Sequence, residues 1–70
     1  MMIKVFKTNV NDLNLVQEIK NSIKTKLGIQ QVTFDLEDID CILRVEGLRF
    51  SPLDIIQHVN HHGCSCEELL

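Results

Sequence analysis

The sequence predicts one α+β domain, residues 1–70, in which two helices cover one face of an antiparallel sheet. Hydrophobic residues recur at three- and four-residue steps over residues 11–27 and 51–62, as they do in helices buried on one side. They alternate with polar residues over 32–36 and 41–45, as in strands with one buried face. The elements follow in the order strand, helix, strand, strand, helix, strand, which favours this architecture.

The first half of the chain contains a predicted strand at residues 3–6 and a predicted helix at residues 11–27. The strand is a short apolar run that ends before Thr8 and Asn9. Asp12, or Asn11 before it, can cap the start of the helix, and Gly28 is the expected stop. The buried stripe of this helix comprises Leu15, Val16, Ile19, Ile23 and Leu27.

The second half contains a predicted hairpin and a second helix. The two alternating runs are joined by an acidic turn at residues 37–40. Ser51 at the N-cap and Pro52 in the first turn begin the helix, and Gly63 ends it. Residues 64–66 are predicted to form a short edge strand with both cysteines on one side. The predicted core is Leu15, Val16, Ile19, Ile23, Val32, Phe34, Leu36, Leu43, Val45, Ile55, Ile56 and Val59.

This element order is the ferredoxin-like arrangement, βαββαβ. In that topology the first strand–helix loop, the hairpin turn and the last helix–strand loop lie at the same end of the sheet. Residues 11–15, 37–41 and 61–66 are therefore predicted to be neighbours in space, where they would form a pocket.

Charge and composition exclude several classes of function. A net charge of -3, three Phe and no Trp or Tyr argue against nucleic-acid binding. No apolar run approaches the length of a membrane span, and residues 1–9 lack an export signal. We therefore expect a cytoplasmic protein with reduced thiols. The sequence contains no recognisable catalytic set, so we expect that it is not an enzyme.

Residues 58–66 hold all three histidines and two of the three cysteines of the chain. Imidazole nitrogen and thiolate sulfur are ligands that bind Zn(II) and Cu(I). His58 and His62 are four positions apart and share one face of the predicted helix, whereas His61 faces outward. We predict a site for Cu(I) or Zn(II) formed by Cys64, Cys66, His62 and His58.

Each of these residues also has a structural interpretation. Cys64 and Cys66 could fill an edge of the core as small hydrophobic side chains. The histidines could form the solvated end of a helix, where polar or positive side chains are stable. By strand alternation Cys41 is predicted to be a buried core thiol, with a ligand role as the alternative because it adjoins the turn.

Four segments, at residues 7–10, 27–29, 32–46 and 51–63, resemble the heavy-metal-associated domains of copper chaperones and metal-transporting ATPases. The resemblance covers nearly the whole chain and implies a ferredoxin-like fold and the binding of a soft metal ion. In that family the first loop carries a Cys-x-x-Cys pair that holds the metal. Here the matching positions are Asp12 and Leu15, so the loop site of the family is absent.

Two hypotheses about function follow. The first is a small metal-binding, chaperone-like protein whose ligands lie at the end of the second helix, with a metal-transport or other protein as partner. The second is an interaction module on the same fold that binds no metal. It would use an apolar patch on the open sheet face, formed by Ile42, Ile29 and Val5, or the acidic strip around the hairpin, which comprises Asp35, Glu37, Asp38 and Asp40.

Overall fold

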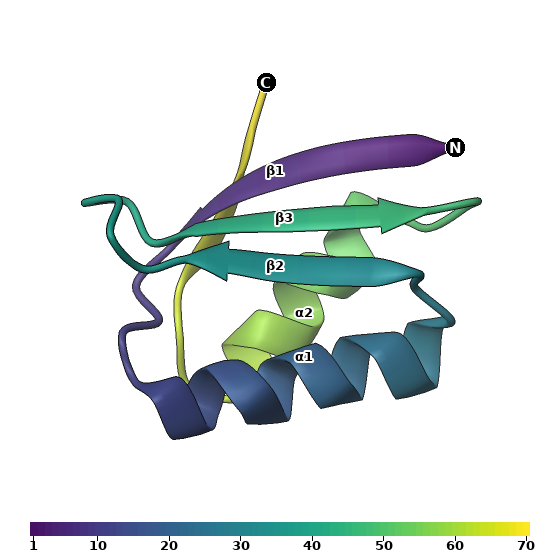
Figure 1. Ribbon diagram of the computed structural model, residues 1–70. Coiled ribbons are helices and arrows are strands. Elements are labelled where there is room, and N and C mark those ends of the chain that lie inside the picture. Colours follow the sequence, from purple (N-terminus) through teal and green to yellow (C-terminus); the bar gives the residue numbers. More distant parts are fainter.

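A computed structural model describes all residues from 1 to 70 and shows the predicted order of strands and helices (Figure 1). Neither helix is both long enough and apolar enough to cross a membrane. The elements are β1 (Met2–Thr8), α1 (Leu13–Leu27), β2 (Gln31–Asp35), β3 (Ile42–Gly47), α2 (Pro52–His61) and β4 (Cys66–Leu69).

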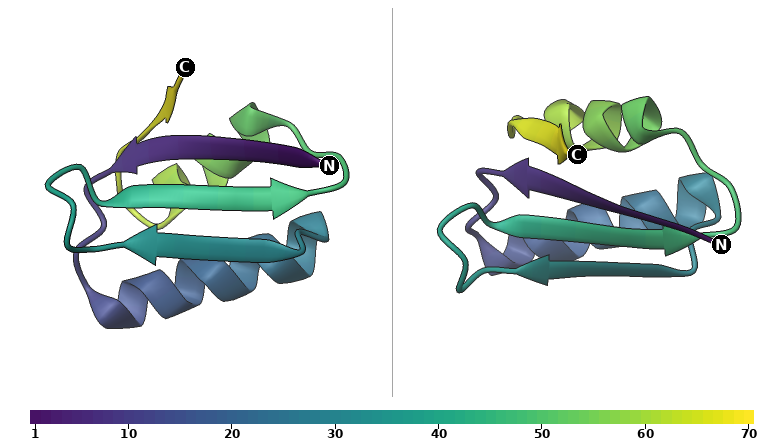
Figure 2. Two further views of the ribbon diagram at one scale, coloured as in Figure 1. Left: turned by 45° about the horizontal axis from the view of Figure 1, so that its top comes forward. Right: turned by 90° about the horizontal axis from the view of Figure 1, so that it is seen from above.

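The four strands form one antiparallel sheet in the order β2-β3-β1-β4, and both helices lie on the same face of it (Figures 1 and 2). The two central strands, β1 and β3, are paired from Met2↔Gly47 to Phe6↔Leu43. The short strand β4 is an edge strand beside β1, paired from Val5↔Leu69 to Thr8↔Cys66. The ferredoxin-like α+β fold is confirmed.

The ends of α1 agree with the sequence. The Asp12 carboxylate oxygen Oδ1 accepts the backbone N–H groups of Asn14 at 2.8 Å and Leu15 at 3.3 Å. These bonds satisfy two of the donors that a helix start leaves without partners. At the other end Gly28 has φ 63, in the left-handed region that glycine adopts without strain. Local signals therefore determine where this helix begins and ends.

Replacing Asp12 with Ala is expected to lower the free energy of unfolding by about 1 kcal/mol, because the helix loses its capping oxygen. Denaturation in urea, followed by circular dichroism, measures this change. An Asp12→Asn variant is the control, since an amide oxygen also caps and should retain most of the stability. Affinity for Cu(I) should be the same in both variants as in the wild type, and a large loss would show that this loop does hold metal.

Helix α2 begins after Ser51 with Pro52 in its first turn, as predicted, although the Ser51 hydroxyl makes no capping bond. The helix ends at His61, and Gly63 follows with φ 82. The N–H of Gly63 donates to the carbonyl of Asn60 at 2.9 Å. This left-handed exit turns the chain back toward the sheet.

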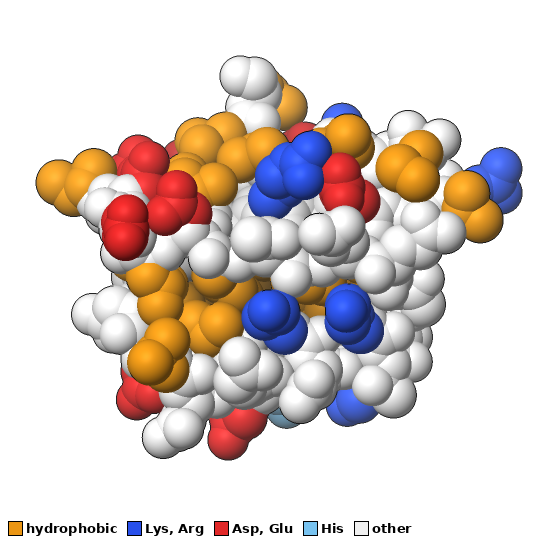
Figure 3. All heavy atoms as spheres, viewed as in Figure 1, with side chains coloured by type: hydrophobic (Ala, Val, Ile, Leu, Met, Phe, Trp, Pro, Cys, Tyr) orange, Lys and Arg blue, Asp and Glu red, His pale blue; other side chains and the backbone are white.

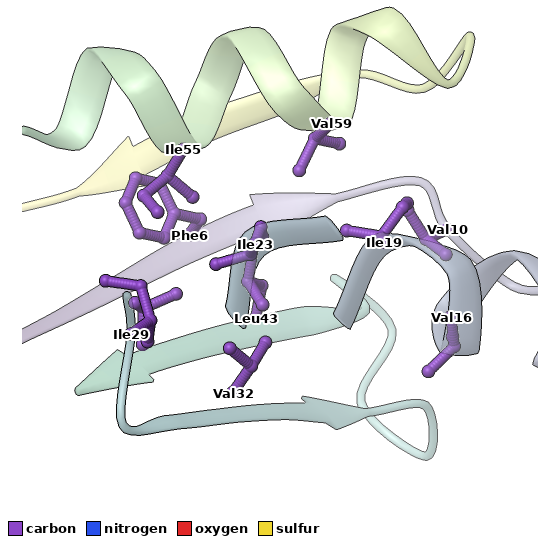
Figure 4. Packing of buried hydrophobic residues seen from close by; sticks show 11 residues of the cluster. Phe6, Val10, Val16, Ile19, Ile23, Ile29, Val32, Leu43, Ile55 and Val59 are labelled. Carbon is purple, nitrogen blue, oxygen red and sulfur yellow. The ribbon is translucent and has the colours of Figure 1, made fainter. Parts of the chain in front are cut away.

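The core lies between the sheet and the two helices (Figure 4). Eight of the predicted core residues are buried, and the other four are partly buried against them. The prediction missed Phe6, Val10 and Ile29, which are also buried. The hypothesis that Ile29 contributes to an apolar patch on the open sheet face is wrong, because Ile29 is buried. It follows the left-handed Gly28, which directs the chain back over the core.

Two strand boundaries also differ from the prediction. Cys41 has φ 44 and lies outside β3, which begins at Ile42, so the prediction of a buried thiol within the strand is wrong. Strand β4 begins at Cys66 and not at Cys64, because the N–H of Cys64 still donates to the carbonyl of Val59 at 3.4 Å. The two cysteines therefore do not share one side of a strand.

Candidate functional site

Three connections meet at one end of the sheet, as the topology predicts: the loop from β1 to α1, the hairpin turn and the loop from α2 to β4 (Figure 1). The N–H of Thr8 donates to the carbonyl of Asp40 at 3.0 Å, which ties the first loop to the turn. The N–H of Ser65 donates to Oδ1 of Asn9 at 2.8 Å, which ties the last loop to the first. The predicted convergence is therefore present.

An open depression of about 660 Å³ lies between these connections, and we call it the loop-end groove. Two of the three cysteines, Cys41 and Cys66, line it. The cysteines are all free thiols and partly exposed. The groove is lined by Lys7, Thr8, Asn9, Asn11, Ile39, Asp40, Cys41, Ser65, Cys66 and Glu67.

Thr8 lies between the two cysteines of the loop-end groove. On one side it is the strand partner of Cys66 in the pairing of β1 with β4. On the other side its hydroxyl donates to the carbonyl of Cys41 at 2.7 Å, and Thr8 itself is buried. Cys41 and Cys66 are therefore separated by Thr8 and do not pair with each other.

The two thiols of the groove are free and not joined in a disulfide. A disulfide requires Cα atoms within about 7 Å. A metal ion between two sulfurs adds two bonds of about 2.3 Å each and spans a wider gap. With Thr8 between the two cysteines, a shared ion is the more accessible of the two links.

Burial affects the acidity of two of the thiols. It raises the pKa of the Cys66 thiol from 9.0 to about 11, and it raises the pKa of Cys64 as well. The cause is desolvation, which disfavours the charged thiolate. Cys66 is therefore protonated at neutral pH, and a metal ion that binds it must displace that proton.

The raised pKa of Cys66 predicts a loss of stability in alkali. Between the unfolded value of 9.0 and the folded value of about 11, the unfolded chain gives up this proton while the folded protein keeps it. The free energy of unfolding should therefore fall as the pH rises through this range. Urea denaturation with a reducing agent, at about pH 8 and about pH 10, should show a smaller fall for Cys66→Ser than for the wild type. Equal falls would contradict the assignment.

The three histidines lie elsewhere, in an open polar groove between α1 and α2 that we call the interhelical groove. It is lined by Ser22, Lys26, Gln57, His58, His61 and His62. His58 and His62 are partly buried and His61 is exposed, in agreement with the helical angles predicted from the sequence.

The structure separates the predicted metal ligands. Cys66 lies in the loop-end groove, and His58 and His62 lie in the interhelical groove. The Cys64 side chain packs against the core, with its sulfur 3.8 Å from the carbonyl oxygen of His62. Nowhere do three His, Cys, Asp or Glu side chains form a group that could hold a metal ion.

The structure makes Cys41 a stronger candidate for a metal ligand than the sequence does. In the sequence, the signal for a ligand role is its position beside the turn, at the end where the loops meet. Alternation along the strand pointed instead to the core. The left-handed backbone at Cys41 breaks this alternation, and Cys41 lines the same groove as Cys66.

The acidic residues of the hairpin have a structural role. Oδ1 of Asp35 accepts the N–H of Glu37 at 3.1 Å, and Oδ1 of Asp38 accepts the N–H of Asp40 at 2.8 Å. Such bonds are typical of aspartates that shape turns. Figure 3 shows acidic side chains gathered at this end of the molecule, around the turn.

The comparisons with known proteins give no family. No model of a protein family matches the chain, and no curated protein has a matching sequence. The resemblance to heavy-metal-associated domains is therefore an inference from the sequence pattern.

Proposed function

We propose that this protein binds a soft metal ion in the loop-end groove and acts as a small metal-handling protein, not as an enzyme. The observation that carries the proposal is that Cys41 and Cys66 line one groove, on opposite sides of Thr8. The sequence-based resemblance to heavy-metal-associated domains supports it, because the groove includes the loop that carries the metal in that family. A metal-transport protein is the proposed partner.

The ligands of the groove favour Cu(I) over Zn(II). Thiolates are soft ligands, and soft ligands select Cu(I). A structural zinc site almost always has four ligands, usually sulfur or nitrogen. Apart from the two thiols, the groove offers the carboxylates of Asp40 and Glu67, and Asp40 is 3.7 Å from the ammonium group of Lys7.

The proposed pair differs from the set that the sequence predicted. Cys66 is retained, and Cys41 takes the place of Cys64 as its partner. Cys64 is on the connection after α2 and packs against the core, with its sulfur directed at the carbonyl of His62. It is therefore available as a matched control.

The test is a Cu(I) titration of the reduced protein without oxygen, in competition with a chromogenic chelator. The Cys41→Ser/Cys66→Ser variant should lose one equivalent of binding, because both proposed thiolates are gone, and its circular dichroism should match the wild type. Each Cu(I) displaces thiol protons, so the affinity of the wild type should also fall as the pH is lowered.

The Cys64→Ser variant should keep the wild-type affinity. In NMR spectra of the wild type, one equivalent of Cu(I) should shift the amides of residues 7–9, 40–42 and 65–67. If the double variant binds as tightly as the wild type, or if Cys64→Ser alone abolishes binding, the proposal is wrong.

Protein interaction without metal is the alternative, and one feature of the open sheet face favours it. Ile3 and Leu69 are 49% and 40% exposed there. Both lie close to Val5, which is the strand partner of Leu69. If the wild-type protein binds no Cu(I), this apolar face becomes the better explanation of what the domain does.

A further inference from the structure

The interhelical groove has its own chemistry, separate from the thiols. It lies between α1 and α2, and all six of its residues are polar or charged. None of the six carries a carboxylate, and three of them are histidines. The orientation of the imidazole rings determines which ligand can bind in this groove.

The ring of His62 is held in one orientation. Its Nδ1 is 2.8 Å from the carbonyl oxygen of His58. A carbonyl only accepts hydrogen bonds, so Nδ1 carries the proton and donates. In the neutral ring Nε2 then has no proton and its lone pair is free. Histidines that bind metals are commonly held by a hydrogen bond of this kind.

The ring of His58 is held in a similar way from the other helix. Its Nδ1 is 3.2 Å from the hydroxyl oxygen of Ser22 in α1. A hydroxyl both donates and accepts, so it can accept the Nδ1 proton when Nε2 is needed for a ligand. His58 and His62 are four positions apart and therefore lie on one side of α2 and its end.

We propose that His58 and His62 bind a borderline divalent cation, of the class Zn(II), Ni(II) or Cu(II), through their Nε2 atoms in the interhelical groove. Imidazole nitrogen is the ligand that suits these ions. Water completes the coordination, because the groove is open to solvent. The site is independent of Cys41 and Cys66, and it does not rest on the function proposed above.

An anion is the competing ligand, because Lys26 lines the same groove. A neutral His62 offers a lone pair at Nε2, which repels an anion and attracts a cation. Cation binding and anion binding therefore predict opposite changes in affinity when the Lys26 charge is removed. Removing that charge strengthens the binding of a cation and weakens the binding of an anion.

The test is a titration of the Cys41→Ser/Cys66→Ser protein with Ni(II), followed by calorimetry and by the imidazole proton signals in NMR. In this background, His58→Ala and His62→Gln should each weaken Ni(II) binding at least about tenfold, as expected when a ligand is lost. His61→Ala should change the affinity less than about twofold, since the ring of His61 is not held by a hydrogen bond to Nδ1. Ni(II) should broaden the ring protons of His58 and His62 first.

Lys26→Gln is the variant that separates the ligands without disturbing the fold, because Lys26 is exposed. This variant should bind Ni(II) more tightly than the protein that keeps Lys26. Inorganic phosphate should bind neither to the variant nor to the protein that keeps Lys26. The proposal is overturned if Lys26→Gln weakens Ni(II) binding, if phosphate binds and depends on Lys26, or if His61→Ala costs as much affinity as His62→Gln.

Discussion

Replacing Phe6 with Ala is expected to lower the free energy of unfolding by about 3–5 kcal/mol. Phe6 is fully buried in the central strand β1, on the face covered by the helices (Figure 4). Its removal leaves a cavity that a rigid sheet cannot close. Native proteins are stable by only about 5–15 kcal/mol, so this loss is a large fraction of the total stability.

Phe34→Ala provides the matched control for this prediction. Phe34 lies in the edge strand β2 and is only partly buried against the core. The same change of side chain should therefore cost less there. Urea denaturation followed by circular dichroism gives both values, and an equal or larger loss for Phe34→Ala would show that the core is not centred on β1.

The second large effect is expected for Ile19→Ala, at about 2–5 kcal/mol. Ile19 is fully buried in the middle of α1, where the helix faces the sheet. Ala is a strong helix former, so the loss reflects packing and not helix propensity. Thermal unfolding should show a clearly lower midpoint for this variant.

Leu13→Ala is the control in the same helix, because Leu13 is 70% exposed. Substitutions at such surface positions usually change stability by no more than about 0.5 kcal/mol. If Leu13→Ala destabilises the protein as much as Ile19→Ala, α1 does not pack on the sheet through the predicted stripe.

The elements of this protein could be predicted from the sequence because their signals are local. Asp12 caps the helix that follows it within three residues, and Gly28 ends that helix with its own backbone angle. The apolar stripe of α1 repeats every three or four residues, so it identifies Val16, Ile19 and Ile23 as buried. The clustering of histidines and cysteines in residues 58–66, at the end of α2 and in the connection after it, is also visible in the sequence.

Which of those candidate ligands lie together depends on contacts between distant parts of the chain. Thr8 meets Cys41 across 33 positions, Ser22 meets His58 across 36, and Asn9 meets Ser65 across 56.

The sequence by itself determined the element order, the ends of α1, most of the core and the types of ligand available. Periodicity and capping act over a few residues, and each such signal lies in the segment that it controls. The tertiary structure alone decided that Cys41 and Cys66 line one groove and that His58 contacts Ser22 of α1. The reason is physical: strand pairing and helix packing bring together groups from distant segments, and no short stretch of sequence contains both members of such a pair.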